Sequence, residues 1–533
     1  MKRPLALAVA LALAGCATVP EVPAPAAPAA AVAPAVPAPE VAVLARMRDD
    51  VEALLAAQGE ALWQSWTTGA PLDAAGPMRG REWLADGGAL AALDAMPPAN
   101  DAGEAGRRRM LRDFLVGERL AAAATRAPEP SDLSFAFEGR TLALRDSASL
   151  LAAETDAARR AAIDAARAPA AARAARADEE RAAALADASR RLGLGELPAL
   201  ASELRRASPA ALAALASSTL EATGPAYCGA MDALARGEMG TPLAATHLRD
   251  LPRILRAAHE PRAHAAARLV ADGEAAATAA TGAPLAGRVR LDDRFAPGKS
   301  QRPLAVPVRV PDDVRLSAMP SGGSAEARAF LHELGAALFL SGIRADGVER
   351  RRLGSPAAVE TWGYLLEGLA ADPAWLNERS GIVGDALSRE IKAAQAERLH
   401  AVRMKAARLL RELERAGGSP PGAAGDAKVL SRALCRPVAP EDAARWPLPR
   451  DPLLTTADGL RAALLAAQIE SAMADPGGGP WWRWKGAPAW LAPLWSAGTV
   501  ASPDELARAS GVGAVSPEPM ARVARSRLSA AGW

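Results

Sequence analysis

His332 and Glu333 begin a pattern that holds a catalytic zinc ion in many hydrolases. In the pattern H-E-x-x-H the two histidines are four residues apart and share one face of a helix, so both imidazoles bind one ion. A catalytic zinc takes three protein ligands and a water, and the glutamate accepts a proton from that water. This chain reads H-E-L-G-A, with Ala336 where the second histidine belongs. An alanine methyl has no lone pair, so the residues indicate a zinc-type site that is one ligand short.

The elements that must position these residues are mostly helices. Apolar residues recur at helical spacing along most of the chain. The predicted helices are 41–66, 147–191 (as one helix or as two broken near Pro169), 212–220, 242–275, 325–340, 358–369 and 381–415. Apolar and polar residues alternate over 133–144 around Glu138-Gly139, which predicts a β-hairpin. The Gly- and Pro-rich stretch 416–426 is predicted to be a loop or a disordered insertion.

Length and charge limit the alternatives. The chain has 533 residues, 50% of them hydrophobic, which is enough for one large multi-lobed body or two lobes. Its 63 basic and 61 acidic residues nearly cancel, and no basic run is interleaved with aromatic residues. We therefore expect no nucleic-acid partner.

The N-terminal residues predict export and a membrane anchor. A basic start and a short apolar run end in Leu13-Ala14-Gly15-Cys16, which resembles a bacterial lipobox. On this interpretation residues 1–15 are a lipoprotein signal peptide, and lipidated Cys16 attaches the protein to a membrane of the cell envelope. An ordinary secretory signal is the alternative. Residues 16–40 are rich in Pro and Ala and are predicted to form a semi-rigid tether.

Three consecutive blocks resemble the active-site region of the thimet oligopeptidase and oligoendopeptidase F family of zinc metallopeptidases. The first contains Phe295-Ala-Pro-Gly-Lys299, the strand region 307–316 and Pro320-Ser-Gly-Gly323; the second is His332–Leu338; the third is Val359–Glu367. The resemblance implies a mostly α fold with minor β, a large multi-helix zincin-like body with a deep central cleft, and a small β element beside the metal helix. Residues 291–533 would then be the catalytic-region homologue, and residues 41–290 an N-terminal helical region.

By the same resemblance, His332 and Glu360 stand at zinc-ligand positions and Glu333 at the position of the general base. Family enzymes also place tyrosine and histidine side chains from the C-terminal region over the metal. This chain has two tyrosines, Tyr227 and Tyr364, and its last histidine is His400. Gly459 precedes Leu460-Arg-Ala462 where the family has a tyrosine.

These departures predict a pseudopeptidase whose His332, Glu333 and Glu360 are relics, with no cofactor. It would bind extended peptides, for example through the strand 304–310, or serve as a scaffold for another envelope protein. The alternative is an active zinc metallo-oligopeptidase with an unorthodox ligand such as His259 or His264. A third interpretation is a purely structural lipoprotein.

Several of these side chains also have simpler interpretations. His332 and Glu333 could be polar residues that water satisfies in a wet cleft, and Glu360 could pair with one of Arg350, Arg351 and Arg352. The tryptophan cluster between Trp481 and Trp495 is predicted to be core, with a binding groove as the alternative. Cys228 and Cys435 either form a disulfide or remain free thiols.

Overall fold

Helices make up most of the described chain. The computed structural model describes residues 39–124, 133–474 and 479–532, so the predicted signal peptide, Cys16 and nearly all of the tether lie outside the described residues. The elements before residue 290 are α1 (Pro39–Thr68), α2 (Trp83–Asp86), α3 (Gly88–Asp94), α4 (Ala102–Ala123), β1 (Ser134–Phe137), β2 (Arg140–Ala143), α5 (Ser147–Ala153), α6 (Ala157–Arg191), α7 (Leu197–Arg205), α8 (Pro209–Met239), α9 (Leu251–Ala257) and α10 (Leu269–Thr281). Those after it are β3 (Arg290–Asp292), β4 (Leu304–Arg309), β5 (Asp313–Ser317), α11 (Ser324–Gly342), α12 (Val348–Arg352), α13 (Pro356–Glu367), α14 (Pro373–Ser380), α15 (Gly384–Ala416), α16 (Ala423–Leu434), α17 (Pro440–Arg445), α18 (Thr456–Ala472), α19 (Ala487–Ser496), α20 (Pro503–Ala509) and α21 (Glu518–Ala530). The predicted mostly α fold with minor β is confirmed.

The strands form two small sheets. β1 and β2 make the predicted antiparallel hairpin, with Glu138 and Gly139 at its turn in the left-handed region at φ 49° and 73°. The other sheet has the order β3-β5-β4, in which β3 runs parallel and β4 antiparallel to the central β5. It packs against α11, so the small β element expected beside the metal helix is present.

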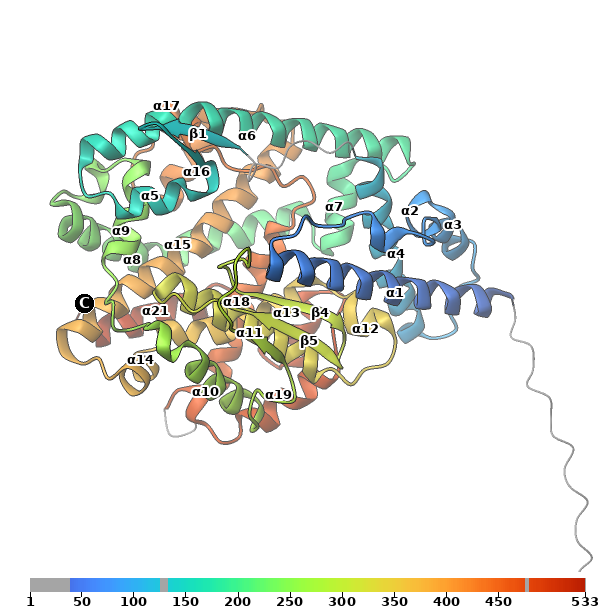
Figure 1. Ribbon diagram of the computed structural model, residues 1–533. Coiled ribbons are helices and arrows are strands. Elements are labelled where there is room, and N and C mark those ends of the chain that lie inside the picture. The colour runs from blue at the N-terminus through green and yellow to red at the C-terminus, as the bar shows by residue number, and fades with distance from the viewer. Residues whose placement is uncertain (1–38, 125–132, 475–478, 533) are drawn as a thin grey trace, which may run out of the picture.

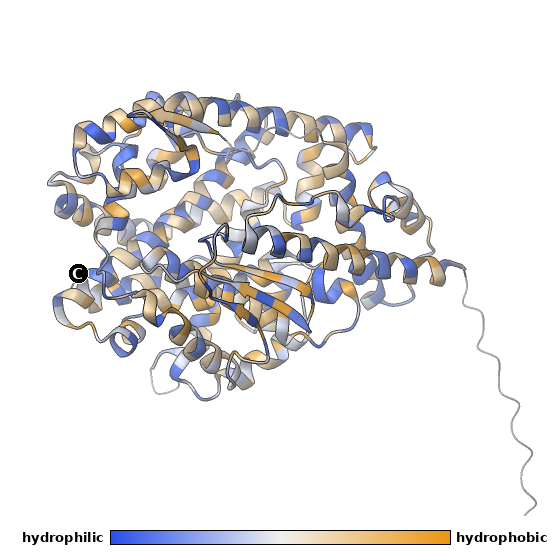
Figure 2. Cartoon of the chain, in the orientation of Figure 1, coloured by the Kyte–Doolittle hydropathy of each residue, from blue (hydrophilic) through white to orange (hydrophobic). Residues whose placement is uncertain are grey.

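The helices form an upper and a lower part joined by α8 and α15 (Figure 1). α6 runs along the top with the hairpin and α16, whereas the three-stranded sheet, α11 and α13 lie below, next to α1. Most helices carry hydrophilic and hydrophobic residues side by side, as expected when one face of each is buried (Figure 2). The two largest core clusters each combine residues from before and after position 290, such as Leu220 with Leu399 and Ala276 with Phe330. In the described ranges, no helix is both long enough and apolar enough to cross a bilayer.

Four predicted element boundaries are wrong. The helix predicted at 212–220 is part of α8, which continues through Pro225 to Met239. Pro169 lies inside the continuous helix α6, and the real break is at residues 154–156, where the Asp156 side chain caps α6 by accepting from the Arg159 N–H. Pro169 has no N–H, so the carbonyl of Ala165, four residues earlier, loses its usual helical partner. Both residues are exposed, so water can satisfy that carbonyl. The stretch 242–275 is broken by turns after α9, and α16 begins at Ala423, inside the predicted loop.

Candidate functional site

Two glycines bring α11 and α13 into unusually close contact. A Cβ at Gly335 of α11 would lie 2.2 Å from the Trp362 carbonyl oxygen, and a Cβ at Gly363 of α13 would lie 2.7 Å from Nε2 of His332. Real Cβ atoms do not approach other atoms so closely, so only glycine fits at these two points. The His332 ring therefore packs directly on the backbone of α13, which carries Glu360.

His332 lies between two carboxylates of α13. Its Nε2 is 3.3 Å from Oε2 of Glu360, and its Nδ1 is 3.0 Å from Oε2 of Glu367. Burial alone lowers the pKa of His332, but the hydrogen bonds and negative charges of Glu360 and Glu367 outweigh burial and raise it to about 10. The structure thus brings together His332 and Glu360, as the spacing of 28 residues suggested.

Arg328 lies one helical turn before His332 in α11 and contacts the same carboxylate, Glu367. Its guanidinium is 2.9 Å from Glu367 and 2.6 Å from Glu397 of α15. Burial raises the pKa of Glu367, but the opposite charges of Arg328 and His332 lower it to about 2. Glu367 is therefore a carboxylate that fixes the orientation of the His332 ring, the position that a supporting residue takes behind a metal-binding histidine.

Glu333 points toward the sheet. Its Oε2 accepts a 2.7 Å hydrogen bond from the Ala305 N–H of β4, and burial raises its pKa. Protein groups therefore satisfy His332 and Glu333, and the interpretation that water alone satisfies them is wrong. Since α1 also packs on the backbone of Pro307 and Val308, part of the strand expected to pair with peptides is already covered.

Tyr364 and Lys405 line the open side of the site. The Tyr364 ring packs edge-on against His332, with ring centroids 4.7 Å apart, and Nζ of Lys405 lies 5.4 Å from the Tyr364 ring centre. Burial raises the pKa of Tyr364 and lowers that of Lys405. A Cβ built on Gly459 of α18 would lie 3.9 Å from the Tyr364 hydroxyl, so position 459 does face the site.

The predicted cleft consists of two adjoining cavities. One, of about 580 Å³, contains Glu360, Tyr364, Lys405 and Gly459 in its wall. The other, of about 750 Å³, lies between the upper helices and α15. The residues common to both walls are Ala401, Met404, Arg408, Leu448 and Pro449.

The donors at this site are too few for a catalytic zinc with three protein ligands. Two ligands about 2.1 Å from a tetrahedral zinc lie about 3.4 Å apart, and Nε2 of His332 and Oε2 of Glu360 are 3.3 Å apart. These two donors therefore fit a zinc ion. The third position is the methyl of Ala336, and no group of three or more His, Cys, Asp or Glu side chains suited to a metal occurs in the part of the chain that the structure describes.

The two histidines considered as substitute ligands face other partners. His259 lies 2.9 Å from Glu390 and 3.1 Å from Glu397, and His264 lies 3.1 Å from Glu390. Burial lowers the pKa of His259, but these two carboxylates raise it to about 9. Neither histidine is placed at the third ligand position.

Other sequence interpretations are also resolved. Glu360 contacts His332, while Arg351 pairs with Glu52, so the alternative in which Glu360 pairs with an arginine of α12 is wrong. Trp481 and Trp495 are buried in the lower core, which confirms the core interpretation for these two. Cys228 and Cys435 form a disulfide.

Sequence reasoning missed Arg328, Glu367 and the placement of Tyr364 in the cleft. Helical spacing carried a signal for each of them. Arg328 precedes His332 by four residues, and Tyr364 and Glu367 follow Glu360 by four and seven, so each pair shares a helix face.

The fold is similar to that of two solved structures of peptidases. The structure resembles an M32 carboxypeptidase from Deinococcus radiodurans R1 with a TM-score of 0.58 and 15% identity, over 92% of this chain and 99% of that chain. It also resembles a putative oligoendopeptidase F from Bacillus anthracis str. Ames with a TM-score of 0.55 and 12% identity, over 91% of this chain and 84% of that chain. No family model and no curated protein matches by sequence. At these identities the likeness establishes the fold.

Proposed function

We propose that the chain is a lipid-anchored pseudopeptidase of the bacterial cell envelope, which binds extended peptides or supports a partner protein in its cleft without cleaving peptide bonds. The observation that carries this proposal is the two-donor set, in which His332 and Glu360 meet beside a methyl group at Ala336. Removing even a supporting residue behind a metal ligand weakens metal binding or activity about 10 to 100-fold, so losing a ligand should cost more.

The cleft retains groups that can hold a peptide. The cavity of about 580 Å³ presents the Glu360 carboxylate, the Tyr364 ring and the Lys405 ammonium within one wall. Such a mixture of charged, hydrogen-bonding and aromatic groups suits a peptide backbone and its termini. Since β4 is partly covered, we assign peptide contact to this cavity wall.

The first test is a peptide-library cleavage assay combined with zinc analysis of the purified protein. We expect the wild type to cleave nothing and to hold well under one zinc per chain, and Ala336→His to approach one zinc per chain. Ala325→His places a histidine at an exposed position of the same helix and should change neither readout. Peptide cleavage by the wild type, with stoichiometric zinc that is lost in His332→Ala, would overturn the proposal in favour of an active peptidase.

Peptide binding is tested separately by fluorescence polarisation with labelled library peptides. Gly459→Phe directs a ring into the cavity beside Tyr364 and should weaken binding at least about tenfold. Gly117→Phe changes an exposed helical glycine with no atom within 4 Å of its Cβ position and is the control. Equal binding by both variants and the wild type would remove peptide recognition from this cleft.

The anchor is tested through Cys16. Cells that express the full chain should incorporate labelled fatty acid into the protein and hold it in the membrane fraction, whereas Cys16→Ser should remove both the label and the membrane association. Unchanged fractionation and labelling in Cys16→Ser would contradict lipid anchoring.

A further inference from the structure

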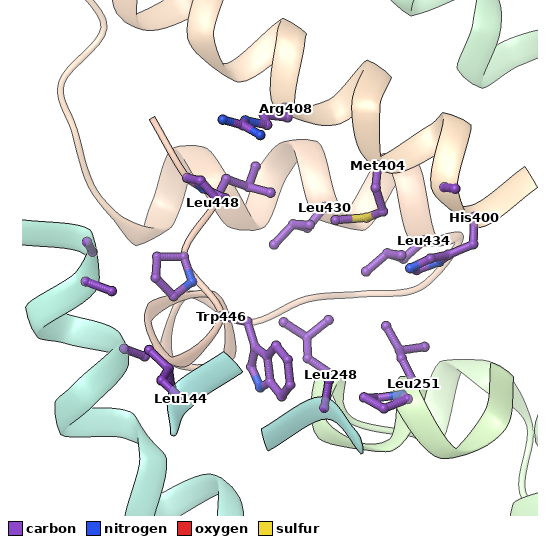
Figure 3. A pocket seen from close by; sticks show the side chains of 18 of the residues that line it. Leu144, Leu248, Leu251, His400, Met404, Arg408, Leu430, Leu434, Trp446 and Leu448 are labelled. Atoms are coloured by element: carbon purple, nitrogen blue, oxygen red, sulfur yellow. The ribbon is translucent and has the colours of Figure 1, made fainter. Parts of the chain in front are cut away.

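The larger cavity, of about 750 Å³, is mainly apolar, and its wall does not include His332, Glu333 or Glu360. In Figure 3 the side chains of Leu248, Leu251, Leu430 and Leu434 converge around it, and the Trp446 ring closes one side. A volume of this size is within the range of about 300 to 1,000 Å³ that small-molecule sites occupy. The lining therefore suits a ligand with a long hydrocarbon part.

The wall offers little backbone for a peptide to pair with. Most of it consists of the helices α6, α9, α15 and α16, whose interior N–H and C=O groups bond within the helix. Among the described residues of the wall, the extended part is the segment 446–450, in which Pro447 and Pro449 have no N–H and the Leu448 N–H donates to Asp426. A peptide buried here would leave its own amides without partners, whereas a hydrocarbon chain has none to satisfy.

Most charges of the wall neutralise one another. Arg167 contacts Asp164, Arg181 contacts Asp178, and Arg450 contacts Glu179. Arg328 and Glu397 pair with each other. His400 contributes no positive charge near pH 7, because burial lowers its pKa to about 4, and its Nδ1 lies 2.9 Å from the Tyr227 hydroxyl.

Among the described residues that line this cavity, Arg408 is the cation inside it that has no carboxylate partner. It lies where the two cavities meet, donates one hydrogen bond to the Arg450 carbonyl, and leaves its buried Nε without a partner. No carboxylate of the described residues is within ion-pair distance of it. Arg256 also lacks a carboxylate partner, but it is exposed at the outer rim and bonds to Ser149.

We infer that this cavity binds an anionic amphiphile of the long-chain fatty acid class, with its hydrocarbon chain among the leucines and its carboxylate on Arg408. Such a ligand brings one negative charge to a cation that has no carboxylate partner among the described residues, and it needs no backbone partner along its length. This site is separate from the proposed peptide contacts around Tyr364, so either can exist without the other.

The test measures displacement of a fluorescent long-chain fatty acid by palmitate, by hexadecanol and by a peptide with apolar C-terminal residues. Palmitate should displace the probe, and hexadecanol, which lacks the charge, should do so at least about tenfold less well. Arg408→Met should weaken palmitate at least about tenfold, whereas Arg256→Met, a charge removed from the rim of the same cavity, should leave it unchanged. Leu251→Trp fills the cavity and should abolish binding of the probe.

Thermal unfolding of each variant checks that it is folded, and Arg408→Met keeps the test decisive if Leu251→Trp does not fold. The inference is overturned if palmitate fails to displace the probe, if palmitate and hexadecanol bind equally, or if Arg408→Met binds palmitate like the wild type. Displacement by the peptide but not by palmitate would also overturn it, and would assign the cavity to peptide recognition. None of these outcomes depends on peptide cleavage or on Ala336.

Discussion

Gly335→Ala should destabilise the protein, although alanine is the better helix former. The new Cβ would lie 2.2 Å from the Trp362 carbonyl oxygen of α13 and 3.0 Å from Cα of Gly363. These neighbours are backbone atoms, which cannot turn away as a side chain can. The two helices must therefore separate by roughly 1 Å, in a core where added volume is poorly tolerated.

The expected magnitude is the difference between two effects. Overpacking in a well-packed core costs about 1–3 kcal/mol, and replacing glycine by alanine inside a helix gains about 1 kcal/mol. Gly335→Ala should thus lower the free energy of unfolding by up to about 2 kcal/mol. Gly117→Ala, in α4 with no atom within 4 Å of the new Cβ, should raise it by about 0.5–1 kcal/mol.

Urea unfolding followed by circular dichroism measures both variants against the wild type. Denaturant is preferable to heat because a chain of this length shifts its melting temperature by only about 1 °C per kcal/mol. The two substitutions are chemically identical and should change stability in opposite directions. If Gly335→Ala were as stabilising as Gly117→Ala, the close packing of α11 on α13 that positions His332 would be refuted.

Two further perturbations address other contacts. Because the pKa of His259 is raised from 6.5 to about 9, its charged contacts with Glu390 and Glu397 contribute fully below pH 6.5, and this contribution is lost as the pH rises through 9. His259→Gln should therefore cost about 3 kcal/mol more near pH 6 than near pH 10, and an equal cost in urea unfolding at both would contradict the charged state. The disulfide closes a separation of 207 residues between Cys228 and Cys435, so its reduction should lower stability by about 2–5 kcal/mol, and identical urea midpoints with and without reductant would contradict this contribution.

The sequence alone predicted the two helices of the site, α11 and α13, and the contact between His332 and Glu360. Their apolar periodicity is uninterrupted, so the predicted starts lie within one and two residues of the starts of α11 and α13. The contact between His332 and Glu360 followed from a resemblance of motifs, and the spacing of the motifs was enough to place it.

Contacts between distant segments were beyond sequence reasoning. Glu390 and Glu397 of α15 bind His259, more than a hundred residues away, and no local pattern marks that pairing. The turn after α9 did carry a local signal, because Pro261 disfavours helical backbone at Glu260, but no local pattern marks the hydrogen bond that Glu390 accepts there from the Glu260 N–H. Likewise, the lack of a carboxylate partner at Arg408 can be recognised only when the ion pairs of Arg328 and Arg450 are known.

The two departures from the peptidase pattern should be separable by experiment. Ala336→His supplies a third donor, but it adds no hydroxyl over the site. Gly459→Tyr would add one, and its Cβ would lie 3.1 Å from Cε of Lys405, a flexible chain that can move aside. Losing one oxyanion donor typically costs about a hundred to a thousandfold in turnover. We therefore expect zinc content to rise in the Ala336→His variant, with measurable peptide cleavage only when Gly459→Tyr is added. Equal cleavage by the single and double variants would instead show that the Tyr364 hydroxyl, which already lies in the cleft on α13, can serve in place of a tyrosine at position 459.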